Sequence, residues 1–208
     1  MREYYVHHDF YNMESDDMLT ILSHFPTYQQ TTSSTCGPVC LKMALKYFGV
    51  DSDEMEIAIK TNCKIPGGTK IRDMETFLEM LGFEILSEKD FSRNKEGKIF
   101  DFTSFKNFVI NNLKNGYPII IENIDAGGHY RIIIGYDELS KFRGNEKNDI
   151  LIFADPADTY DGKQDGYNYA PAYRTFKMWF DDHHLPPDQK FHSFIVVKGL
   201  KNWETENS

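Results

Sequence analysis

A cysteine with glutamines just upstream is the feature of this sequence that most directly predicts chemistry. Cys36 stands at the apparent start of an amphipathic helix, where the helix dipole and unpaired backbone N–H groups favour thiolate over thiol. Gln30, or its neighbour Gln29, could turn its side-chain amide toward the same point. With the Cys36 backbone N–H, that amide would offer two donors to a developing oxyanion. These residues together predict acyl transfer through a cysteine nucleophile.

A nucleophile of this kind needs a base and a group that orients the base, and the sequence offers both. His129 follows Gly127-Gly128 and opens a strongly β-prone run. Asp155 ends a second apolar run, directly before Pro156, which stops strand pairing. We expect neighbouring strands to hold the two side chains together.

These segments resemble the C39-type peptidases and their C39-like relatives, within the papain-like cysteine peptidases. That family carries the pattern Q-x(5)-C-G-x-A-C-L-x-M, and the matching residues here are Gln30, Cys36, Gly37, Cys40, Leu41 and Met43, with Val39 in the place of the alanine. Three later segments also match, namely Tyr47-Phe48-Gly49, His129 with its apolar strand and Gly135-Tyr136-Asp137, and Asp155-Pro156.

The resemblance implies a role for each residue. Cys36 would be the nucleophile, His129 the general base and acid, Asp155 the group that orients the imidazole, and Gln30 the oxyanion donor. The best-known family members are N-terminal domains of peptide-exporting membrane transporters that trim leader peptides after Gly-Gly. This chain carries neither transmembrane nor ATPase segments, so that substrate does not carry over.

We therefore expect a cysteine peptidase that hydrolyses a peptide bond through a thioester on Cys36. Two alternatives stay open: an acyltransferase of the phytochelatin-synthase-like branch, and a non-catalytic domain that binds peptides. Cys40 and Cys63 are interpreted as ordinary packing residues. If His129 were not the base, the base would have to be sought among His183, His184 and His192.

The elements that must position these residues follow from hydrophobic periodicity. Helical spacing predicts helices over residues 36–47, 55–60, 71–81 and 105–113, and β-prone runs predict strands over residues 83–87, 118–122, 130–136, 150–154 and 194–198. The short link over 124–128 allows only a hairpin-like return, so the sheet should be mainly antiparallel. The expected fold is α+β and papain-like, with the nucleophile helix packed on that sheet. A polar insert over 140–149 looks like a long hairpin loop.

Length and composition indicate one domain over residues 1–208, with residues 1–25 as a possible N-terminal extension that packs on the domain, occupies the cleft or does neither. The formal net charge of −9 argues against nucleic-acid binding. The N-terminus shows no signal peptide and no run is long enough for a membrane helix, so we expect a cytoplasmic protein whose partner is a peptide or protein substrate. Three cysteines without framework spacing fit a reducing compartment. The sequence does not indicate an oligomeric state.

Metal and cofactor sites are not expected. The segment 181–184, with His192, has metal-capable side chains but no ordered ligand spacing. The segment 155–166 is rich in oxygen ligands but lacks the EF-hand order. We interpret that segment as a solvated loop which, with the aromatic run 167–173, could border the cleft and help to choose substrates. Trp179 and Trp203 are expected to be packing residues.

Overall fold

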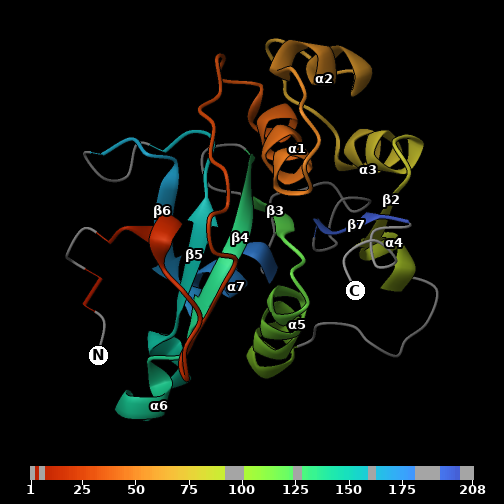
Figure 1. The fold of residues 1–208 in the computed structure, drawn as a ribbon. Helices are drawn as coiled ribbons and strands as arrows, with labels where there is room; N and C mark the ends of the chain where they lie inside the picture. The colour runs from red at the N-terminus through yellow and green to blue at the C-terminus, as the bar shows by residue number, and fades with distance from the viewer. Residues whose placement is uncertain are drawn as a thin grey trace.

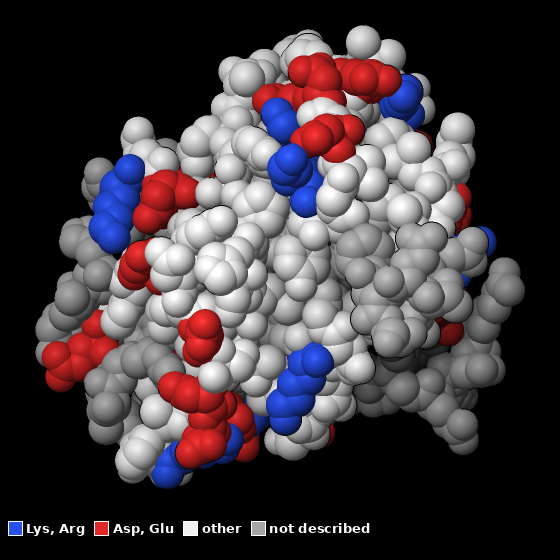
Figure 2. All heavy atoms as spheres, in the orientation of Figure 1, with Lys and Arg blue, Asp and Glu red and all other residues white. Residues whose placement is uncertain are grey.

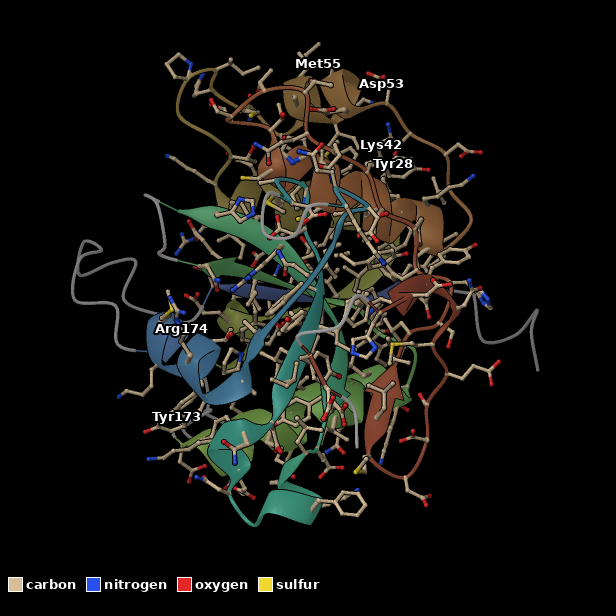
Figure 3. All side chains as sticks on the ribbon, turned by 90° about the vertical axis from the view of Figure 1, so that its left-hand side faces the viewer. Tyr28, Lys42, Asp53, Met55, Tyr173 and Arg174 are labelled. Carbon is tan, nitrogen blue, oxygen red and sulfur yellow. The ribbon has the colours of Figure 1, made fainter. Side chains whose placement is uncertain are left out.

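An antiparallel sheet lies between two groups of helices in the computed structural model of the protein (Figures 1 and 3). The structure describes residues 3–4, 8–91, 101–123, 128–158, 163–180 and 193–201. Trp203 and the metal-capable residues over 181–184 and at 192 lie outside these ranges, as does the side chain of Trp179.

The sheet is antiparallel throughout its described pairs. Its strands follow the order β2-β7-β3-β4-β5-β6, and β1 pairs with β4 beside this path. The strands are β1 (Leu19–Ile21), β2 (Phe83–Ser87), β3 (Ile119–Asn123), β4 (His129–Asp137), β5 (Ile150–Ala154), β6 (Tyr167–Pro171) and β7 (Phe194–Leu200). The α+β fold class with a mainly antiparallel sheet is therefore confirmed, as is the hairpin-like pairing of β3 with β4.

Some helix ends coincide with capping residues in the sequence. Asp53 caps α2 by accepting hydrogen bonds from the backbone N–H groups of Met55 and Glu56, and α1 ends two residues before Gly49, which adopts a φ of +80°. The described helices are α1 (Cys36–Tyr47), α2 (Glu54–Lys60), α3 (Ile71–Met80), α4 (Glu88–Phe91), α5 (Phe102–Lys114), α6 (Ser140–Arg143) and α7 (Ala172–Phe180), with short 3₁₀ turns at Phe10–Asn12 and Glu146–Asn148.

Strand β4 lies between β3 and β5, and helices pack on both of its faces. Tyr130 contacts Gly37 of α1, whereas Tyr136 lies near Lys106 of α5. The register shift between Ile133 and Gly135 turns these two tyrosines to opposite faces. In Figure 3, α1 and α2 accordingly lie above the sheet and α5 lies below it.

The polar insert over 140–149 is more structured than the hairpin loop that the sequence predicts. It forms α6 and a 3₁₀ turn, and Asp149 at its end is fully buried. This carboxylate accepts hydrogen bonds from the Tyr136 hydroxyl (3.1 Å) and the Ser140 backbone N–H (2.8 Å), and its Oδ2 lies 3.1 Å from the ammonium of Lys106. A buried carboxylate needs such partners, which explains why the insert folds around it.

The described part of the N-terminal segment 1–25 packs on the rest of the protein. Strand β1 pairs with β4, Phe10 is buried, and the Tyr4 hydroxyl donates a 2.8 Å hydrogen bond to Asp137. One hydrophobic cluster extends from Tyr4 to Val197. The single domain over residues 1–208 stays a prediction.

Charge is unevenly distributed on the face of the molecule shown in Figure 2. Acidic side chains gather over α2, where Asp53 and Glu56 are exposed, and again at the lower left of the view. The middle of this face carries few charges. The basic side chains of the face are scattered, and most of them lie near acidic side chains. The exclusion of nucleic acid as a partner stays a prediction.

Candidate active site

Cys36 is the first residue of α1, as the sequence predicts. Its side chain is buried, with only 6% of the residue exposed, because Val39, Cys40 and Met43 pack the same helix into the core. The turn after it is equally tight. A Cβ atom on Gly37 would lie 3.0 Å from the Met74 sulfur and 3.2 Å from Thr69, so a larger residue would require these neighbours to shift.

His129 and Asp155 meet at one end of the sheet. His129 opens β4 directly after Gly128, whose φ is +100°, and Asp155 follows the last residue of β5. The His129 Nε2 atom lies 2.7 Å from Asp155 Oδ1. The Asp155 backbone N–H donates to the Gly166 carbonyl (2.8 Å), and the Ala157 backbone N–H donates to Oδ1 (2.9 Å), so the carboxylate is held by its own turn.

The surroundings of Cys36 favour its thiolate. Burial alone would raise the pKa of the thiol, but hydrogen bonds from the His129 side chain and from the backbone N–H groups of Tyr130 and Gly37 outweigh it and lower the pKa. Since His129 Nε2 is bonded to Asp155, the ring nitrogen that serves Cys36 is Nδ1. Cys40 behaves in the opposite way, because complete burial raises its pKa well above the ordinary value.

The imidazole of His129 is correspondingly basic. Burial would lower its pKa, but the hydrogen bonds to Asp155 and Cys36 raise it to about 9. The pKa of Asp155 is lowered in spite of its burial, mainly by His129, with contributions from the Ala157 N–H and the charge of Arg131. The opposite shifts of His129 and of its two partners all favour a charged imidazolium and anionic partner groups.

Gln30, unlike Gln29, is half-buried beside the turn that carries Asp155. Gln29 is exposed, whereas Gln30 is half-buried and its backbone N–H donates to the Pro156 carbonyl at 2.9 Å. The Gln30 side-chain N–H₂ donates to the Thr32 carbonyl at 2.7 Å, and its oxygen has no partner among the described residues. One amide hydrogen therefore remains available for a further acceptor.

Residues 25–35, which we call the strap, carry Gln30 and lead into α1. Lys42 of α1 lies 4.5 Å from the ring centre of Tyr28, and Figure 3 shows the two side chains together. The Thr31 backbone N–H and hydroxyl both donate to the buried carboxylate of Glu54 on α2, at 3.0 and 2.9 Å. The strap is thus fixed to both helices.

The strap also contacts the segment that follows Asp155. The Thr27 hydroxyl donates to the Asp165 carbonyl (2.7 Å), and the Tyr167 hydroxyl donates to the Phe25 carbonyl (2.5 Å). A Cβ atom on Gly166 would lie only 2.5 Å from Thr27. The segment 155–166 is therefore anchored on both sides of its undescribed part, 159–162.

Asn168 is a buried polar neighbour of the site that the sequence interpretation did not single out. Its side-chain N–H₂ donates to Asp155 Oδ2 at 2.6 Å, and only 5% of the residue is exposed. In the sequence it belongs to the aromatic run expected to border the cleft, but Tyr167 and Asn168 are both buried in β6. An amide inside a β-prone run directly after the Asp155 segment is the signal that could have found it.

Within the described ranges, no group of three or more His, Cys, Asp or Glu side chains is arranged to hold a metal ion. The side chains brought together around Cys36 suit proton transfer and nucleophilic attack instead.

Comparison with known proteins gives the family. The model of the Peptidase_C39 like family matches residues 22–179, a range that contains Gln30, Cys36, His129 and Asp155. The chain belongs to this C39-like peptidase family. No curated protein sequence matches it significantly.

Two solved structures share the fold of this C39-like protein. One is the peptidase domain of Streptococcus ComA, a bifunctional ABC transporter involved in quorum sensing. It is 17% identical, the match covers 83% of this chain and 96% of that one, and the TM-score is 0.54. The other is a C39-like protein from Bacillus anthracis, described as a candidate peptidase, which is 16% identical over 87% of this chain and 98% of that one, with a TM-score of 0.57. At such identities the likeness shows the fold.

None of the described helices is both long enough and apolar enough to cross a membrane.

Proposed function

We propose that this C39-like protein is a cysteine peptidase. The observation that carries the proposal is that His129 Nε2 lies 2.7 Å from the Asp155 carboxylate, while the same imidazole lowers the pKa of the Cys36 thiol at the first turn of a helix. That arrangement supplies a nucleophile, a base and a group that orients the base. Membership of the C39-like family agrees with it.

In acylation, the Cys36 thiolate attacks the carbonyl carbon of a peptide bond, and the carbonyl oxygen becomes an oxyanion. As the tetrahedral intermediate collapses, the C–N bond breaks, and the imidazolium of His129 gives its proton to the leaving amine. The product that remains on the enzyme is a thioester. Asp155 holds the imidazole in the tautomer that carries the Nε2 proton and stabilises its charged form.

In deacylation, the now neutral imidazole accepts a proton from water, which attacks the thioester carbonyl. The second tetrahedral intermediate expels the Cys36 thiolate and releases a carboxylic acid. His129 thus returns to its imidazolium state, and the starting ion pair is restored.

The Gln30 side chain is proposed as one oxyanion donor, and the Cys36 backbone N–H as the other, because the first N–H groups of a helix have no partner within it. We expect Gln30→Ala to lower kcat by about 10²- to 10³-fold, the usual cost of losing one such donor. Steady-state kinetics on any cleaved peptide measures this, and KM should change little.

Gln29→Ala is the matched control, since Gln29 is the neighbouring amide but is exposed. It should retain nearly full activity. If Gln29→Ala proved the more damaging change, the oxyanion donor would have been assigned to the wrong glutamine.

Replacement of Asp155 by asparagine separates orientation from charge. We expect Asp155→Asn to lower turnover by about 10⁴-fold, because an amide in this position can hold the wrong tautomer of His129 and stabilises the imidazolium less well. The rate of Cys36 alkylation should fall much less, since alkylation needs no proton delivery. Equal losses in the two assays would contradict the role given to Asp155.

The substrate is proposed to be a peptide or protein, and a peptide library with and without added amines tests hydrolysis against acyl transfer. Hydrolysis predicts products that end in a free carboxylate in both samples, as measured by mass spectrometry. Amide products formed only when amines are present would instead identify an acyltransferase. Binding of peptides without any turnover would identify a non-catalytic domain.

A further inference from the structure

The amide of Asn168 lies on the side of Asp155 opposite to His129. Strand β6 pairs with β5, so that Asn168 is the register partner of Phe153, two residues before Asp155. From there its N–H₂ donates to Asp155 Oδ2 at 2.6 Å, while Oδ1 accepts from His129 and from the Ala157 backbone. Both oxygens of the carboxylate are therefore held, each by a different element.

Burial of the Asn168 side chain has a free-energy cost, and the hydrogen bond to Asp155 is what offsets it. Its own side-chain oxygen is buried and has no hydrogen-bond partner among the described residues. A buried amide with an unpaired oxygen is unfavourable, and an apolar residue of similar size would avoid that cost. What an apolar residue could not provide is the donor to Asp155 Oδ2.

A carboxylate held at only one oxygen can rotate about its Cβ–Cγ bond, and rotation of Asp155 would weaken its hydrogen bond to His129 Nε2. The 2.6 Å contact from Asn168 prevents that rotation. Because Asn168 sits in a strand of the sheet, its position is set by backbone pairing and does not depend on the loop 155–166.

We propose that Asn168 is a positioning residue of the site, which fixes the Asp155 carboxylate so that His129 is held as the partner of Cys36. This inference rests on the proposed cysteine peptidase function. It extends the series of interacting side chains from Cys36 through His129 and Asp155 to Asn168. Partners of this kind, one step removed from the reacting atoms, commonly change activity or affinity by about 10- to 100-fold in metal sites, where their effects are best measured.

The test measures the alkylation of Cys36 by iodoacetamide between pH 5 and 10, with peptide mapping to follow the Cys36 adduct alone. Asn168→Leu keeps the size of the side chain and removes the donor. We expect its alkylation rate at pH 6 to fall about 10-fold, because a looser His129 stabilises less thiolate. At pH 10, where the thiol ionises without help, the rate should equal that of the wild type.

Asn168→Asp is the conservative variant that restores a donor. The charged groups that act on this carboxylate pair are His129 and Arg131, both on β4. Two carboxyl groups this close share one proton, and a protonated Asp at 168 can donate to Asp155 Oδ2 as the amide does. We therefore expect Asn168→Asp to keep the alkylation rate at pH 6 within about threefold of the wild type.

Asn112→Ala serves as a matched control, because Asn112 is a part-buried amide on α5 whose N–H₂ donates to the Phe108 carbonyl, away from the site. A wild-type alkylation profile for a folded Asn168→Leu would overturn the proposal. If Asn168→Leu does not fold, Asn168→Asp decides alone, and loss of its reactivity at pH 6 would overturn the proposal.

The same assay separates this inference from the proposed function. If His129→Ala leaves the wild-type profile unchanged, the pairing of Cys36 with His129 is wrong. If His129→Ala shifts the profile and folded Asn168→Leu does not, only the role of Asn168 is wrong.

Discussion

Replacing Cys36 by alanine is expected to lower peptide-bond hydrolysis by about 10⁶-fold, the loss seen when the nucleophile of a well-developed peptidase is removed. The substitution deletes one sulfur atom at the first turn of α1, so the cavity that it creates is small and the fold should persist. The measurement compares cleavage of a peptide library by the wild type and by Cys36→Ala, with thermal unfolding as the check on folding.

Cys63→Ala provides the control for this experiment. Cys63 is only half-buried and its thiol donates to the Ser34 carbonyl at 3.3 Å, so it is a second accessible thiol close to the strap. Its removal should leave most of the activity. Comparable hydrolysis by the wild type and by Cys36→Ala would end the proposal that Cys36 is the nucleophile.

The second large effect concerns the pH dependence of Cys36 alkylation. In the wild type the thiolate should already be present at pH 6, because the hydrogen bond from His129 and the N–H groups of Tyr130 and Gly37 lower the pKa of the thiol in spite of its burial. A further change is expected near pH 9, where the imidazolium of His129 loses its proton.

His129→Ala removes the charge that stabilises the thiolate. With a free-thiol pKa of about 8.5, only about 0.3% of the thiol is ionised at pH 6, so the alkylation rate there should fall by up to about 300-fold. The rates at pH 10 should converge, and the change near pH 9 should disappear. An unchanged profile would show that His129 does not pair with Cys36.

The limits of several elements could be predicted from the sequence because glycine, proline or aspartate residues stand at the ends of their apolar runs. Strands β2 (Phe83–Ser87) and β5 (Ile150–Ala154) have the predicted limits, and α1 begins at Cys36 as expected. The run of β5 ends at Asp155-Pro156, and that of β2 begins after Gly82. Such residues fix element ends locally, so that no knowledge of the tertiary structure is needed.

Other elements depend on partners that are distant in the sequence. Strand β1 has only three residues and exists because β4 pairs with it. Strand β6 falls in the aromatic run 167–173 that the sequence places beside the cleft, and α7 is not predicted. In β6 the polar side chain of Asn168 is buried and donates to the Asp155 carboxylate. A half-buried strand normally places its apolar side chains inward and its polar side chains outward, so this strand lacks the usual pattern.

Candidate residues for the site could be selected from the sequence, but their charge states could not. The setting of Cys36 at a helix start and the resemblance to C39-type peptidases selected Cys36, His129 and Asp155, and the contact between His129 and Asp155 follows from how β4 and β5 pair. The choice of Gln30 over Gln29 agrees with their exposure. The backbone N–H of Tyr130, which donates to the Cys36 sulfur, could not be predicted from the sequence. Nearly every residue carries a backbone N–H group, and only the folded structure shows which one lies beside the thiol.

The backbone hydrogen bond from Gln30 to the Pro156 carbonyl joins two parts of the site that are 126 residues apart. One is the strap that carries the amide, and the other is the turn that carries Asp155. If the strap detaches locally, the amide leaves the site and the turn loses its neighbour in the same event. Inactivation by local opening would then be all-or-none, with no half-assembled form that keeps one part of the machinery and lacks the other.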